Sequence, residues 1–65
     1  MPKRMTVREA IREVEADGWR MQKRKGMGHR QFTHPTKPGK VTISGNPGEQ
    51  IDAGTWASIR RQASI

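Results

Sequence analysis

Cysteine and tyrosine are absent from this chain of 65 residues, and its aromatic side chains are limited to two tryptophans and one phenylalanine. Without cysteine, neither a disulfide nor a thiolate metal site can stabilise the fold. The histidine, aspartate and glutamate residues lack the spacing of zinc ligands, so we expect no metal site and no cofactor. Only 31% of the residues are hydrophobic, and a chain this short buries about 60% of its unfolded surface. We therefore expect a single domain, residues 1–65, with a thin core.

Long apolar runs are also missing. No stretch approaches the roughly 20 apolar residues of a membrane-spanning helix, and no helical segment combines a basic face with a large apolar face. The start, Met1-Pro2-Lys3-Arg4, precedes no apolar segment of the kind found in signal peptides. We therefore expect a cytoplasmic protein that makes no contact with a membrane.

Acidic residues are scarce relative to basic ones. Thirteen Lys and Arg residues against six Asp and Glu give a formal net charge of +7. So strong a positive field on a small domain usually serves a polyanion. Charge alone therefore favours nucleic acid as the partner, and the alternative is a basic surface that only keeps the protein soluble.

Two segments have the apolar spacing of helices. Over residues 6–17, Thr6 and Glu9 form the pattern of a capping box, and Gly18 is placed to end the helix. A second helix is predicted from about residue 53 to residue 63, with Asp52 or Thr55 as its N-cap. The two apolar stripes are Val7, Ala10, Ile11 and Val14 in the first helix, and Trp56, Ile59 and Ala63 in the second.

Three segments between these helices alternate with a period of two, which is typical of strands. They are residues 19–25, 29–34 and 40–44. Short turns join them, and Pro38-Gly39 in the second turn favours a reversal of the chain. The predicted fold is therefore α+β, in the order αβββα, with a three-stranded antiparallel sheet and both helices on one of its faces.

The alternation assigns the strand residues to two faces of the sheet. The face toward the helices is predicted to hold Trp19, Met21, Phe32, Val41 and Ile43. The open face is predicted to hold Arg20, Gln22, Arg24, His29, Gln31, Thr33, Thr42 and Ser44. Basic, amide and hydroxyl groups on an open sheet suit contacts to phosphates and sugar hydroxyls. The absence of exposed aromatic residues argues against base stacking on this face.

His29 is the candidate catalytic residue. A histidine exchanges protons near neutral pH, and RNA cleavage through the 2′-hydroxyl needs only proton transfers, without a metal. The candidate RNA-binding residues around it are Arg20, Arg24, Lys25, Arg30 and Gln31, and any of the three arginines could stabilise a charged phosphorane. The alternative is a surface histidine that only hydrogen-bonds a phosphate. His34 falls on the side of Phe32, and we expect it to pack at a strand end.

Several motifs taken together resemble those of the HicA-type mRNA interferase toxins, over nearly the whole chain. They are Glu15-Ala16-Asp17-Gly18-Trp19, Gly28-His29-Arg30-Gln31-Phe32-Thr33-His34-Pro35, Thr36-Lys37-Pro38-Gly39-Lys40-Val41-Thr42-Ile43, Gly54-Thr55-Trp56-Ala57-Ser58-Ile59 and Gln62-Ala63. Their combination in this order is more specific than any one of them. The resemblance implies a double-stranded-RNA-binding-domain-like fold, metal-independent cleavage of mRNA by one strand histidine, His29, and neutralisation by a HicB-like antitoxin.

One departure from that family concerns the turn before His29. Family members usually read Gly-Ser-His there, whereas this chain reads Gly26-Met27-Gly28-His29. A glycine therefore replaces a serine whose hydroxyl could bind phosphate or orient the imidazole. Two rival functions remain open on the sequence: a non-catalytic double-stranded RNA-binding module, and an interaction subunit whose basic face docks an acidic protein.

Overall fold

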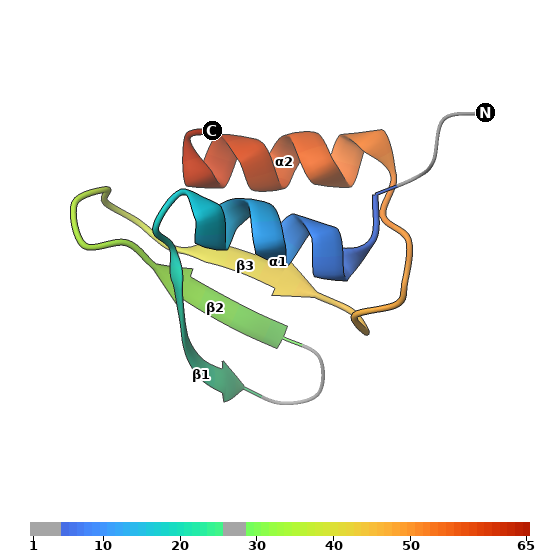
Figure 1. Cartoon of the computed structure of the whole chain (residues 1–65), viewed down its shortest axis with the longest axis horizontal. Coiled ribbons are helices and arrows are strands. Elements are labelled where there is room, and N and C mark those ends of the chain that lie inside the picture. Colours follow the sequence, from blue (N-terminus) through green and yellow to red (C-terminus); the bar gives the residue numbers. More distant parts are fainter. Residues whose placement is uncertain (1–4, 26–28) are drawn as a thin grey trace.

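The chain folds in the order α1 (Val7–Ala16), β1 (Arg20–Lys25), β2 (His29–Thr33), β3 (Val41–Ser44) and α2 (Ala53–Ala63). This computed structural model describes residues 5–25 and 29–65, and of residues 23–25 it describes the backbone alone. The strands form an antiparallel sheet in the order β1-β2-β3. Both helices lie on one side of the sheet, with α2 beside α1 (Figure 1). The predicted α+β fold of order αβββα is confirmed.

The start of α1 is capped twice. Thr6 and Glu9 form the predicted capping box, in which the Glu9 amide donates to Thr6 Oγ1 at 3.2 Å and the Thr6 amide donates to Glu9 Oε1 at 2.9 Å. The segment before α2 satisfies two further amides, because Val7 donates to the carbonyl of Glu49 and Arg8 donates to that of Pro47. These bonds fix the segment that follows β3 against α1.

The core lies between the helices and the sheet. Its fully buried members are Val7, Ala10, Val14, Trp19, Phe32, Val41, Ile43, Ile59 and Ala63. The predicted stripe residues Ile11 and Trp56 are partly buried at the margin of this core. The apolar spacing of both helices and the alternation in β2 and β3 therefore identified the core almost completely.

Met21 is the exception, because its side chain is 46% exposed and its predicted burial is wrong. Met21 pairs with Phe32, which places it on the helix-facing side of the sheet. However, β1 is an edge strand, and both helices pack against β3 at the opposite edge. The register of β1 also shifts between Met21 and Arg24, so regular alternation does not continue along this strand.

The C-terminal ends of both helices meet the segment that joins β2 to β3. Lys37 Nζ donates to Asp17 Oδ2 at 2.5 Å and to the carbonyls of Ala63 and Ser64 at 3.3 and 3.2 Å. A cation at a helix C-terminus is favoured by the helix dipole. The hydrogen bond from Lys37 also holds the pKa of the Asp17 carboxyl below its ordinary value. In addition, Trp19 Nε1 donates to the Ala63 carbonyl at 3.3 Å.

His34 packs in the same junction, as predicted for a histidine at a strand end. Its ring Nδ1 accepts hydrogen bonds from the amides of Thr36 and Lys37, each at 3.1 Å. The proton of the neutral ring must therefore be on Nε2, which lies 2.8 Å from the Asp17 carbonyl and donates to it. The ring also stands edge-on to Trp19, with a centroid distance of 5.2 Å. Both ring nitrogens are thus occupied by structural bonds.

Candidate functional site

The sheet face turned away from the helices is polar. On the two strands β2 and β3, His29 pairs with Ser44 and Gln31 pairs with Thr42. Register partners project from the same face, so these four side chains share one surface. Gln22 of β1 joins it by donating from Nε2 to Thr33 Oγ1 at 2.8 Å. We call this surface the polar sheet face; its members are Gln22, His29, Gln31, Thr33, Thr42 and Ser44.

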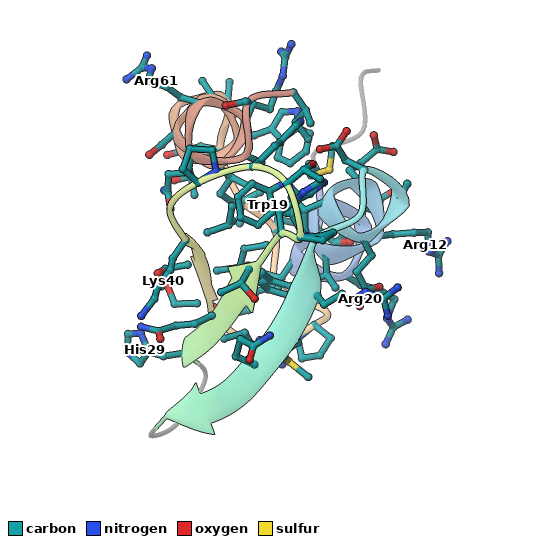
Figure 2. The ribbon with its side chains drawn as sticks, turned by 90° about the vertical axis from the view of Figure 1, so that its left-hand side faces the viewer. Arg12, Trp19, Arg20, His29, Lys40 and Arg61 are labelled. Atoms are coloured by element: carbon teal, nitrogen blue, oxygen red, sulfur yellow. The ribbon has the colours of Figure 1, made fainter. Side chains whose placement is uncertain are left out.

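His29 occupies one end of the polar sheet face. It is the first residue of the central strand, where its backbone pairs with Lys25 of β1 on one side and with Ser44 of β3 on the other. Its side chain is exposed and projects away from both helices (Figure 2). Among the residues that the structure describes, none hydrogen-bonds the His29 ring, so both nitrogens are available to a ligand. The predicted position of His29 on the open face agrees with the structure.

Lys40 is a cation near this face that the sequence interpretation did not select. It is exposed and immediately precedes β3, and its side chain projects on the same side of the molecule as His29 (Figure 2). Lys40 is two residues before Thr42 and four before Ser44, and this spacing places all three on one face of an extended segment. The alternation of the third strand could therefore have identified it.

Arg30 does not lie on the polar sheet face. Its side chain is only 7% exposed, and its Nη1 donates to the Gly45 carbonyl at 2.7 Å. Arg30 pairs with buried Ile43 and is two residues from buried Phe32, so alternation turns it toward the helices. The predicted contact of Arg30 with RNA does not fit this placement; its guanidinium instead anchors the loop after β3.

Arg20 is also separated from His29. It pairs with Thr33, the last residue of β2, whereas His29 is the first, and four residues of a strand span about 13 Å. The Arg20 side chain projects to the same side as Arg12 of α1, opposite to His29 (Figure 2). It borders a shallow depression lined by Glu15, Gly18, Trp19, Arg20 and Met21. By register Arg20 lies on the face of Thr33, as predicted, but it is at the far end of the sheet from His29 and the two side chains project apart.

The other predicted RNA-binding residues divide into two groups. Gln31 is half-buried on the polar sheet face, next but one to His29. For Arg24 and Lys25 the structure gives only the backbone, which pairs with Arg30 and His29 respectively, and their side chains lie outside the described part of the chain. Gly28 and the glycine-for-serine difference also lie outside the described residues.

A metal-dependent chemistry would need a cluster of ligands. Within residues 5–25 and 29–65, no group of three or more His, Asp or Glu side chains is placed to hold a metal ion. The same part of the chain contains no helix of the length and apolarity required to cross a bilayer. What the described residues do offer is a single accessible imidazole among hydroxyl and amide groups, with a lysine on the same side.

Comparison with protein families shows to which family this chain belongs. The family model of the HicA toxin of bacterial toxin–antitoxin systems matches residues 7–65, which include every helix and strand. The chain belongs to the HicA toxin family. A search of curated proteins returned no match. Membership in the HicA family supports a toxin role within a toxin–antitoxin pair.

Proposed function

We propose that this HicA family member is a metal-independent endoribonuclease, an mRNA interferase that acts on cytoplasmic mRNA through His29. The observation that supports the proposal most strongly is the position of His29: an exposed imidazole, unbonded by any described residue, on the central strand of a polar sheet face. His34 provides an internal contrast, since both of its ring nitrogens are occupied. One accessible imidazole is sufficient to move the proton of a 2′-hydroxyl.

The proposed reaction is an internal transfer of the phosphoryl group. The 2′-oxygen of the ribose attacks the adjacent phosphorus, the bond from phosphorus to the 5′-oxygen breaks, and a 2′,3′-cyclic phosphate remains. His29, as general base, takes the proton of the 2′-hydroxyl, and a water molecule supplies the proton that the departing 5′-oxygen requires. Only protons and one phosphoryl group move, so this route requires no metal ion.

Lys40 and the polar sheet face would hold the RNA strand. About 13 Å of extended chain separates residues 40 and 44, so Lys40 is too far from Ser44 to reach the phosphate beside His29. It would bind a neighbouring phosphate instead and would strengthen binding through its charge. The amide of Gln31 and the hydroxyls of Thr33 and Thr42 add hydrogen-bonding groups between these two positions.

The partner of this toxin would be a HicB-like antitoxin protein. Family membership supports a toxin–antitoxin pairing, and an exposed catalytic histidine can be blocked by covering it. We therefore place the inhibitory contact of the antitoxin over His29 and the adjacent part of the polar sheet face.

The test separates a nuclease from a module that only binds RNA. End-labelled RNA and a 2′-O-methylated RNA of the same sequence are incubated with the purified protein in excess EDTA. The proposal predicts shortened products, ending in a 2′,3′-cyclic phosphate, from the first RNA and none from the second. A shifted but intact band with both RNAs would instead identify a non-catalytic RNA-binding module and would refute the proposed reaction.

A further inference from the structure

Ser44 lies directly opposite His29 in the sheet. Both side chains are exposed, and register partners project from the same face. Within the part of the chain that the structure describes, the Ser44 hydroxyl forms no hydrogen bond. Its proton is therefore available to a ligand that approaches His29.

A hydrogen bond at the outer edge of β3 shows which type of pair His29 and Ser44 form, and hence how close they are. The amide of Thr42 donates to Oε1 of Gln62 in α2 at 3.1 Å, so this amide points away from β2. Thr42 and Gln31 therefore form a non-hydrogen-bonded pair, and pair types alternate along an antiparallel ladder. His29 and Ser44, two positions further along, form a pair of the same type. In such pairs the Cα atoms are about 4.5 Å apart and the side chains are closest to each other.

We infer that the Ser44 hydroxyl holds the scissile phosphate of the RNA beside His29, by donating a hydrogen bond to a non-bridging phosphate oxygen. This inference rests on the proposed ribonuclease function. A serine hydroxyl stays neutral in the physiological pH range, so Ser44 donates a hydrogen bond and transfers no proton. The negative charge on the non-bridging oxygens increases as the phosphorane forms, and the bond from Ser44 therefore strengthens in the transition state.

The experiment compares two substitutions at the same position. Ser44→Ala removes the hydroxyl, whereas Ser44→Thr keeps it and adds a methyl group that a strand tolerates well. Single-turnover cleavage by Ser44→Ala is expected to be about 10- to 100-fold slower than that of the parent, because a hydrogen bond to a charged group is lost. Ser44→Thr should restore most of that rate. Thr55→Ala, which removes an exposed hydroxyl from α2, serves as the matched control and should cleave like the parent.

A second measurement does not depend on cleavage. Fluorescence anisotropy with 2′-O-methylated RNA should show weaker binding by Ser44→Ala than by Ser44→Thr, with unchanged thermal unfolding in both. Equal cleavage by the parent and Ser44→Ala, or equal losses in Ser44→Ala and Ser44→Thr, would overturn the role of the hydroxyl while leaving the role of His29 intact. If the parent cleaves no RNA, the proposed function fails, and equal anisotropy for the two variants would then overturn the phosphate contact as well.

Discussion

His29 and His34 are five positions apart in the chain, and their side chains lie in different environments. The ring of His34 donates to the Asp17 carbonyl and accepts from two amides, and its side chain is 9% exposed. The ring of His29 is exposed on the polar sheet face. Structural bonds occupy both ring nitrogens of His34, whereas no described residue hydrogen-bonds the ring of His29. The two residues are therefore expected to respond differently to substitution.

Replacing His34 by alanine should destabilise the fold. The change leaves two amides and the Asp17 carbonyl without their ring partners and removes the contact with Trp19. We expect a loss of about 2–3 kcal/mol in the free energy of unfolding, measured by urea denaturation. His29→Ala provides the comparison and should unfold like the parent. Equal stability of the two variants would contradict the structural role of His34.

Lys40 is expected to contribute to RNA binding through its charge and to take no part in the cleavage step. Lys40→Ala should weaken the binding of single-stranded RNA several-fold and should lower the slope of log K against log salt by about 0.7, the contribution of one phosphate contact. The single-turnover rate at saturating RNA should not change. Arg12→Ala removes the same charge on the opposite side of the molecule and should change the slope less. Identical slopes for these two variants would show that Lys40 makes no specific phosphate contact.

At the scale of elements, the turn between α1 and β1 depends on Gly18. Its backbone is in the left-handed region, with φ at 110°, which glycine adopts without steric cost. A Cβ atom at this position would lie 2.8 Å from His34 Nε2. The turn therefore packs directly against the His34 ring. This contact fixes the end of α1 relative to the segment after β2.

Gly18→Ala should consequently destabilise the protein by about 2–4 kcal/mol, through backbone strain and displacement of the His34 ring. Gly39 separates these two effects, because its φ is 85° but a Cβ atom added there would meet no atom within 4 Å. Gly39→Ala should cost only about 1–2 kcal/mol. Urea denaturation of both variants measures the difference. Equal losses in the free energy of unfolding would mean that the contact with His34 adds nothing to the cost of Gly18→Ala.

At the scale of the whole molecule, Asp17 and Lys37 connect the ends of both helices to the sheet. The pKa of Asp17 is lowered in the folded state, chiefly by the hydrogen bond from Lys37. The folded protein therefore binds fewer protons at this carboxyl than the unfolded chain does. The resulting stability is present above the unfolded pKa and is lost as the pH falls through the folded pKa.

Asp17→Asn tests this connection. The parent should lose stability as the pH falls below about 5, and the variant should lose less, because the residue that carries the lowered pKa is gone. Thermal unfolding at a series of pH values measures both curves. Glu13→Gln, at an exposed carboxylate of α1, controls for the removal of a negative charge. An equally steep pH dependence in the parent and in Asp17→Asn would argue against this coupling.

The sequence was sufficient to predict the element order, the core and the position of His29, because periodicity directly reports which face of an element is buried. The prediction of burial failed at Met21 of β1. Periodicity does not indicate how far two helices extend over a sheet or where an edge strand changes register. For Arg30, charge suggested an RNA contact, whereas the alternation with Phe32 already pointed toward the helices. The long side chain of Arg30 also reaches a partner, the Gly45 carbonyl, that only the folded chain brings near.

In the proposed mechanism, His29 itself performs the proton transfer in RNA cleavage. The most direct measurement is single-turnover cleavage of labelled RNA by His29→Ala in EDTA, alongside anisotropy with 2′-O-methylated RNA and far-UV circular dichroism. We predict a rate lowered by about 10²–10⁴-fold, the contribution of a general acid–base residue, with RNA binding and the spectrum retained. Cleavage by His29→Ala at the parental rate would contradict this role.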